Sequence, residues 1–329
     1  MAKPAHFGLT LSNRSVVLGL SDCAAMLELA RAADQALEWD SVWLGDSIFA
    51  KPRLDVMVAL GALAAVTHRV KLGVGCMASA PLRDPLLLAY QWASFDYLCN
   101  GRSIYVACQG QREAGGGQFA EEFAAFRIDP ATRSRRMEEG IEILRLISTS
   151  ESASYHGEFT RFDNVTVWPR PVQQPLPIWV TANPNLAQPR ARASALERVA
   201  RLGDGWMTTA NTVESLRENL AFIEQCARTC GRPLARDFEV CLYYNIHVND
   251  DREAGLTSAR DYLRAYYGVE YPREFLERWV AIGSPERCAQ EIQKFIAAGA
   301  TTVTLRLVGH DEHGQFERVT HEVLPRLQA

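Results

Sequence analysis

The run SVWL at 41–44 is short and β-prone, LDVMVALGALAAV at 54–66 carries the apolar stripe of a helix, and VKLGVGC at 70–76 is β-prone again. A strand, a helix and a second strand in this order form a βαβ unit, in which the two strands lie parallel. The same alternation continues in both directions along the chain. It predicts an α/β fold built on a parallel sheet.

Working outward from this unit, eight strands are expected, each with a helix after it. No stretch rich in glycine, proline or serine divides the chain, so residues 1–329 are expected to form a single domain. Eight repeats suit a closed (β/α)8 TIM barrel. A doubly wound open sheet is the main alternative, but no G-x-G-x-x-G motif opens the first helix.

Periodicity and capping residues give the bounds of the expected elements. The strands are 6–11, 41–44, 70–76, 103–108, 177–181, 205–208, 238–248 and 302–307. The helices are 21–38, 54–66, 84–98, 132–147, 190–202, 213–230, a helical segment between 250 and 282, and one that begins at Ser284-Pro285. Residues 155–168 alternate and contain turn residues, which predicts a hairpin inserted at the barrel rim.

The charge balance limits the possible partners. The chain has 35 lysine and arginine against 39 aspartate and glutamate residues, which gives no field that favours nucleic acid or an anionic membrane. No apolar stretch of about 18 residues occurs, and the N-terminal residues lack a signal-peptide core, so a cytoplasmic protein is expected. The eight cysteines are expected to be reduced, and Cys226 and Cys230 lack further ligands, so no metal site is predicted.

Several motifs recur in a fixed order. ADQALEWDSVWLGDS (33–47), LAAVTHRVKLGVG (63–75) and DPLLLAYQWASFDYLCNGR (84–102) are followed by PVQQPLPIWV (171–180), RLGDGWM (201–207) and IGSPERCAQEIQKFIAAGATTVTL (282–305). Together they resemble the bacterial-luciferase-like family of flavin-dependent monooxygenases and oxidoreductases. The resemblance spans nearly the whole chain and implies the same barrel fold.

The resemblance also implies a function. The leading expectation is a monooxygenase that takes reduced FMN from a separate flavin reductase and uses O2 to oxygenate a small organic substrate. Two alternatives stay open: hydride transfer with a deazaflavin coenzyme, which many relatives use, and a flavin-binding protein without catalysis. The family habit of dimerising implies a homodimer, to which the apolar helix 54–66 could contribute.

Catalytic residues are sought at the carboxyl ends of the strands, where barrel active sites form. Asp46 and Ser47 follow the second strand, where many relatives carry an acidic residue and then a histidine. Serine cannot replace imidazole as an unaided general base, so the family mechanism does not carry over whole. Tyr243, Asn245 and His247 share one face of their strand and either line the pocket or form a structural row. Asp46, Ser47 and His247 are the predicted catalytic residues.

The cofactor-binding prediction uses three strand ends. The family resemblance places a cis peptide at Gly75-Cys76 or Cys76-Met77 beneath the flavin ring, with a glycine kink as the alternative. It places residues 109–110 beside the flavin phosphate or pyrimidine, and the loop 181–185 at the phosphate. Residues 111–118 are expected to form either a mobile lid or a connector. The predicted cofactor-binding residues are Gly75, Cys76, Met77, Gln109, Gly110, Thr181, Ala182, Asn183, Asn185 and Arg190.

Overall fold

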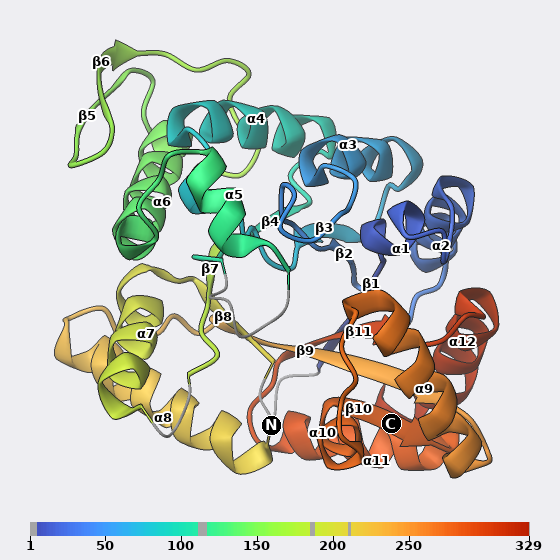
Figure 1. Cartoon of the computed structure of the whole chain (residues 1–329). Helices are drawn as coiled ribbons and strands as arrows, with labels where there is room; N and C mark the ends of the chain where they lie inside the picture. The colour runs from blue at the N-terminus through green and yellow to red at the C-terminus, as the bar shows by residue number, and fades with distance from the viewer. Residues whose placement is uncertain (1–4, 111–116, 185–187, 210–211, 329) are drawn as a thin grey trace.

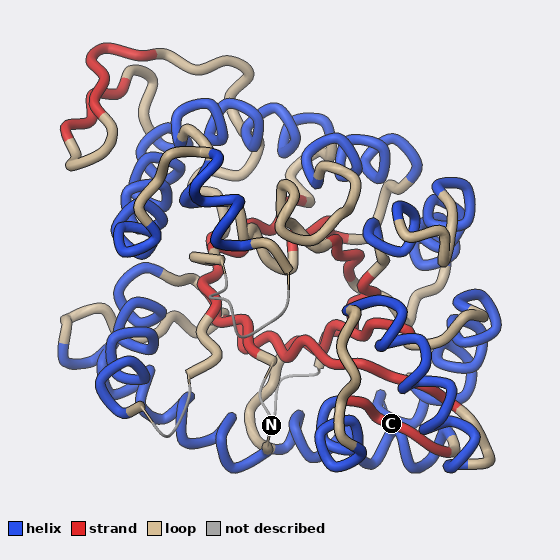
Figure 2. Tube along the Cα trace, in the orientation of Figure 1, coloured by secondary structure: helices blue, strands red, loops and turns tan. Residues whose placement is uncertain are grey.

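Eight parallel strands close into a barrel, ringed by helices (Figures 1 and 2). The computed structural model describes residues 5–110, 117–184, 188–209 and 212–328. The barrel strands, in spatial order, are β1 (His6–Thr10), β2 (Ser41–Leu44), β3 (Lys71–Val74), β4 (Ser103–Ala107), β7 (Ile178–Thr181), β8 (Gly205–Thr208), β9 (Glu239–Val248) and β11 (Thr302–Leu307). β8 pairs with β9, and β11 pairs with β1, so the sheet has no gap. The predicted TIM barrel is confirmed.

The outer ring contains the expected helices and several short additions. The described helices are α1 (Asn13–Val17), α2 (Cys23–Gln35), α3 (Val56–Val66), α4 (Pro85–Leu98), α5 (Phe119–Ala125), α6 (Arg133–Thr149), α7 (Pro189–Leu202), α8 (Val213–Thr229), α9 (Arg252–Tyr267), α10 (Arg273–Trp279), α11 (Pro285–Ala297), α12 (Glu312–Arg318) and α13 (Pro325–Gln328). Capping residues set their starts: the Asp22 carboxylate accepts from the Ala25 amide, and the Ser284 hydroxyl accepts from the Arg287 amide. The predicted start at Ser284-Pro285 is therefore confirmed.

The segment 250–282 differs from the prediction. The predicted helical segment is present as α9 and α10, but an additional strand follows them, β10 (Val280–Gly283), which pairs with the C-terminal half of β9. Periodicity could not separate these few apolar residues from the end of a helix. This strand matters for the cavity, because its pairing with β9 holds the end of α10, where Trp279 lies.

The rim hairpin is present as β5 (Ala153–His156) and β6 (Arg161–Val165), a separate antiparallel pair that projects beyond the helical ring in Figure 2. It begins two residues before the predicted range.

Among the described residues, no helix is both long and apolar enough to span a membrane.

Two indole rings fill the centre of the barrel. Trp43 on β2 and Trp179 on β7 are buried, with ring centroids 5.4 Å apart. Gly8 and Gly73 leave room for Trp43, because a Cβ at either position would overlap its ring, and Gly205 does the same for Trp179. This indole plug closes the barrel below the level at which the strand ends open.

Candidate active site

A cavity of about 780 Å³ opens above the plug, at the carboxyl ends of the strands. Each of the eight barrel strands, or the residues just after it, contributes to the lining, as expected for an active site in this fold. Its size is in the range of pockets for cofactors and small ligands. Of its described lining residues, five are lysine or arginine and one, Asp46, is acidic. The cavity therefore favours anionic ligands.

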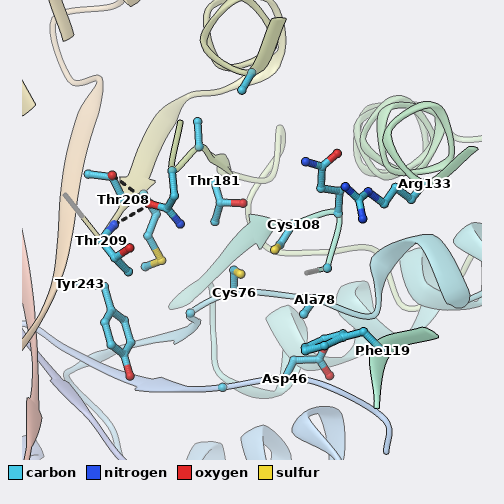
Figure 3. A pocket seen from close by; sticks show the side chains of 18 of the residues that line it. Asp46, Cys76, Ala78, Cys108, Phe119, Arg133, Thr181, Thr208, Thr209 and Tyr243 are labelled. Carbon is cyan, nitrogen blue, oxygen red and sulfur yellow. Dashed lines mark hydrogen bonds between the residues drawn. The ribbon is translucent and has the colours of Figure 1, made fainter. Parts of the chain in front are cut away.

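The floor is formed by the ends of β3 and β4. The Gly75-Cys76 peptide bond is cis, at the first of the two predicted positions. Cys76 and Cys108 lie side by side there (Figure 3). The Cys76 thiol hydrogen-bonds Cys108 and lowers the pKa of Cys108 despite its burial, with help from the Gly110 amide, whereas the same pairing raises the pKa of Cys76.

Asp46 is held at the wall of the cavity by donors on the next strand loop. Its Oδ2 accepts hydrogen bonds from the amide and the hydroxyl of Ser79, both at 2.7 Å. Arg83 lies 3.5 Å from Oδ1 and also pairs with Asp55 at 2.9 Å. Asp46 thus keeps its charge compensated and links the loops after β2 and β3.

One end of the cavity carries small polar groups. This hydroxyl-lined end consists of Gln109, Arg133, Ser134, Thr181, Ser194 and Arg198. The Ser134 hydroxyl donates to Gln109, and Arg198 forms an ion pair of 2.7 Å with Glu138 outside the cavity. Helix α7 begins here at Pro189, and its N-cap residue Gln188 makes no side-chain capping hydrogen bond, so among the described residues the first amides of α7 have no side-chain cap. An uncapped helix start with arginines nearby is suited to a phosphate.

The opposite end is basic and aromatic. This arginine–tyrosine chamber consists of Lys51, Arg53, Tyr243, Tyr266, Tyr267, Trp279 and Arg306. The Arg306 guanidinium carbon lies 4.7 Å from the ring centre of Tyr266 and 5.2 Å from that of Tyr267. Figure 3 places Tyr243 and Arg133 on opposite sides of the cysteine pair, so the two ends are separated by the floor.

Two residues of the chamber, Lys51 and Tyr266, have a lowered pKa. Burial lowers the pKa of Lys51 to about 8, and Arg14, Arg53 and Arg306 add to the effect. Burial alone would raise the pKa of Tyr266, but the surrounding arginines outweigh it and lower that pKa. A lysine and a tyrosine shifted toward neutrality are candidates for acid and base roles.

Most of the predicted cofactor residues line the cavity. These are Gly75, Cys76, Gln109, Gly110, Thr181, Ala182 and Asn183, together with the predicted catalytic residue Asp46. The Asn183 side-chain oxygen accepts from the Thr208 hydroxyl and the Thr209 amide, shown as dashed lines in Figure 3, so it joins the loops after β7 and β8.

Four predicted residues do not line the cavity. The Ser47 hydroxyl donates to the Lys51 carbonyl and shapes the loop after β2. Met77 is buried in the core and bridges β3 to β4. Arg190 is exposed at the start of α7. His247 donates from Nδ1 to the Val308 carbonyl, and burial lowers its pKa, so it is a neutral structural residue. Asn185 and residues 111–116 of the expected lid lie outside the described residues.

Only part of the predicted row Tyr243, Asn245 and His247 on β9 lines the cavity. Tyr243 lines the cavity, but Asn245 is buried, is not part of the lining, and accepts a hydrogen bond of 2.9 Å from Arg306 Nε. Its amide donates to the Trp279 carbonyl. Asn245 therefore connects β9, β11 and the end of α10, and His247 does not line the cavity.

Sequence reasoning missed several lining residues. Arg198 could have been found from helical spacing, because residues 191, 194, 195 and 198 share one face of α7, and that face lines the cavity. Lys51, Tyr266 and Trp279 had no such signal. They come from an irregular loop and from helix ends whose orientation depends on β10.

The family model described as luciferase-like monooxygenase matches residues 5–302. The chain belongs to this family. An uncharacterized protein of Mycobacterium tuberculosis is 32% identical over 180 residues, which cover 54% of this chain and 58% of that protein. The F420-dependent glucose-6-phosphate dehydrogenase of Kineococcus radiotolerans is 26% identical over 91% of each chain. The chain thus spans little more than half the length of the mycobacterial relative and most of the second.

Solved structures of luciferase-like proteins share the fold. The monooxygenase RslO1 from Streptomyces bottropensis superposes with a TM-score of 0.77 at 23% identity, covering 97% of this chain and 99% of that chain. An F420-dependent secondary alcohol dehydrogenase in complex with an F420-acetone adduct gives 0.79 at 18% identity, covering 98% and 99%. Luciferase-like proteins are oxidoreductases that use FMN or the deazaflavin F420.

Proposed function

We propose that the chain is a flavin-dependent monooxygenase that binds reduced FMN and uses O2 to oxygenate a small organic substrate. The observation that carries this proposal is the division of one cavity into an end suited to a phosphate, a floor with a cis peptide, and a separate basic chamber. Bound reduced FMN would supply the electrons that activate O2, because such chemistry belongs to the cofactor.

The donor set fits an anionic, flat cofactor. The hydroxyl-lined end would hold the phosphate through the first amides of α7, the Ser194 hydroxyl and Arg133. Thr181 and Gln109 would orient the group that joins phosphate and ring. The ring would lie over Gly75 and Cys76, where the backbone carries no bulky side chain at Gly75.

The residues of the chain would exclude water and move protons. Met207, Phe119 and Ala182 give the lining an apolar part, which limits water near the reacting atoms. Tyr266 and Lys51, with their shifted pKa values, would give or take a proton at the substrate. Asp46, with its charge compensated by Ser79 and Arg83, would position groups rather than act as a base.

Hydride transfer with F420 is the second candidate, and Lys51 is the observation that favours it. An alcohol dehydrogenase needs a base near the substrate, and a lysine with a pKa of about 8 can serve. The match to an F420-dependent glucose-6-phosphate dehydrogenase over 91% of the chain agrees with this alternative.

Anaerobic calorimetry tests the choice of cofactor. Reduced FMN is expected to bind at least about tenfold more tightly than reduced F420, and Arg133→Met is expected to weaken FMN by about tenfold, the size of a charge-assisted hydrogen bond. Riboflavin, which lacks the phosphate, is the matched control ligand, and its affinity should not change in the variant. Tighter binding of F420 would reject the monooxygenase and support the dehydrogenase.

Two partners follow from the proposed monooxygenase. A separate flavin reductase would deliver reduced FMN, and the chain would act as a homodimer in the cytoplasm. Helix α3 exposes Val58 and α4 exposes Leu87, Tyr97 and Leu98, which offers apolar surface for a second copy. Sedimentation analysis of the purified chain would test the dimer.

A further inference from the structure

Arg306 is buried at the end of β11 with part of its hydrogen-bonding capacity unused. Its exposed fraction is 2%. Nε donates to Asn245 at 2.9 Å and Nη1 donates to the Tyr267 hydroxyl at 2.9 Å, but Nη2 has no hydrogen-bond partner among the described residues. A buried donor without a partner is costly, so the site requires an acceptor that the described residues do not supply.

Other cations gather around Arg306. Lys51 and Arg53 line the same chamber, and Arg14 lies 5.3 Å from the Tyr266 ring centre with two unpartnered nitrogens of its own. In the part of the chain that the structure describes, no carboxylate forms an ion pair with Arg306 or Arg14, and no carboxylate joins the chamber lining. The guanidinium groups of Arg306, Arg14 and Arg53 repel one another, and an anion bound between them would offset that repulsion.

The aromatic side chains of the chamber indicate which kind of anion would fit there. Tyr243, Tyr266, Tyr267 and Trp279 surround the guanidinium, and all four ring centres lie within 5.9 Å of its carbon. Aromatic walls favour a flat apolar group through stacking and burial. The chamber therefore combines an anion acceptor site with a slot for a planar body.

We propose that the arginine–tyrosine chamber is the substrate subsite and that it selects an organic anion with an aromatic or similarly flat body, whose acidic group is bound by Arg306, Lys51 and Arg53. This inference rests on the proposed function, because it assigns the substrate of the same cavity. The position supports a substrate: the cofactor phosphate has its own donors at the opposite end, beyond the cysteine pair.

Benzoate and its neutral isostere benzamide are the probes. Each is titrated into the full chain at pH 7, first without cofactor and then saturated with FMN. Benzoate is expected to bind at least about tenfold more tightly than benzamide in both states, the effect of a charge-assisted hydrogen bond. Arg306→Met is expected to reduce the benzoate-to-benzamide affinity ratio to a value between about one and three. Arg306→Lys should restore part of the ratio, because lysine keeps the positive charge but lacks the planar guanidinium that makes two parallel hydrogen bonds.

Arg133→Met is the matched control, since it removes an arginine from the opposite end of the same cavity. It should leave the benzoate-to-benzamide ratio unchanged. If Arg306→Met does not fold, as judged by thermal melting, Arg53→Met and Lys51→Met replace it, and each should lower the ratio at least about threefold. An unchanged ratio in both would overturn the proposal.

The remaining outcomes separate this inference from the proposed function. Equal binding of benzoate and benzamide by the wild type overturns the subsite. Loss of the benzoate preference on saturation with FMN also overturns it, because the cations then serve the cofactor. If neither reduced FMN nor F420 binds while the benzoate preference persists, the proposed function fails and the anion site remains.

Discussion

At one end of the cavity Arg198 lies 2.7 Å from Glu138, whereas at the other end Arg306 has no carboxylate partner among the described residues. Both arginines line the same space, and both are at least nine-tenths buried. A paired arginine keeps its place whether or not a ligand is present, but an unpaired buried one depends on an anion to offset its cost. The charge of Arg198 is thus balanced within the protein, whereas the charge of Arg306 would be balanced by a bound anion.

The largest expected effect comes from giving Arg306 the partner it lacks. Asn245→Asp places a carboxylate beside Arg306 Nε, so the chamber becomes paired like the opposite end, and benzoate affinity should fall by about 30-fold, as expected for removing a charge-assisted interaction. Calorimetry measures the change. Asn245→Ala is the control, because it also loses the hydrogen bond to Trp279 but adds no charge, and it should lower affinity far less. Equal losses in both variants would contradict the charge argument.

The cysteine floor reports which end a ligand occupies. Because hydrogen bonding from Cys76 lowers the pKa of Cys108, Cys108 should react with iodoacetamide at pH 7.5. Saturating FMN is expected to slow the reaction about tenfold or more by covering the floor, whereas benzoate in the chamber should slow it less than about twofold. Mass spectrometry follows the modification, with exposed Cys230 as the internal reference. Cys76→Ala should slow the reaction of Cys108 by returning its pKa toward normal.

Replacing Gly45 tests whether benzoate binding depends on the position of Arg53 in the chamber. A Cβ at this position would overlap Arg53 Nη1, so Gly45→Ala should displace the guanidinium and weaken benzoate by about fivefold, less than Asn245→Asp because Arg53 is one of several cations. Titration calorimetry reads this change. Gly61→Ala is the control, since a Cβ there meets nothing within 4 Å. Loss of FMN affinity instead would show that Arg53 serves the other end.

The smallest expected effect is the change of benzoate affinity with pH. Burial and neighbouring arginines lower the pKa of Lys51 to about 8, so Lys51 is charged below that value and neutral above it. Benzoate affinity should fall by about threefold between pH 7 and 9, as one cation of the group is lost. Lys51→Met should bind more weakly at pH 7 and show a flatter profile. A steep profile that persists in the variant would assign the titration to another group, such as Tyr266.

The sequence predicted the barrel because its strands and helices are regular and most helix starts carry a capping residue. It missed β10, where four apolar residues directly follow a helix, and the short helix α5. These misses matter for the site. Trp279 and the chamber are positioned by β10, so their arrangement could not be derived from periodicity.

The expectation that site residues lie at strand ends identified residues of the floor and of the hydroxyl-lined end, but four predicted residues do not line the cavity. Asp46, Cys76 and Thr181 line the cavity as the rule predicts. Ser47 follows β2 and His247 lies near the end of β9, yet their side chains hydrogen-bond backbone carbonyls. The rule gives the height of a residue in the barrel, and the direction of its side chain depends on loops that sequence patterns do not describe. The roles of the residues that line the cavity stay predictions.

The indole plug divides the molecule into two halves with different freedom to change. Below it, alanine at Gly8, Gly73 or Gly205 would have to displace a tryptophan ring, so those positions tie three strands to two side chains. Above it, the lining side chains come from separate loops and strand ends that meet mainly at the cavity. A mutant library aimed at a new substrate can therefore vary the residues of the chamber, because the residues below the plug keep the barrel folded.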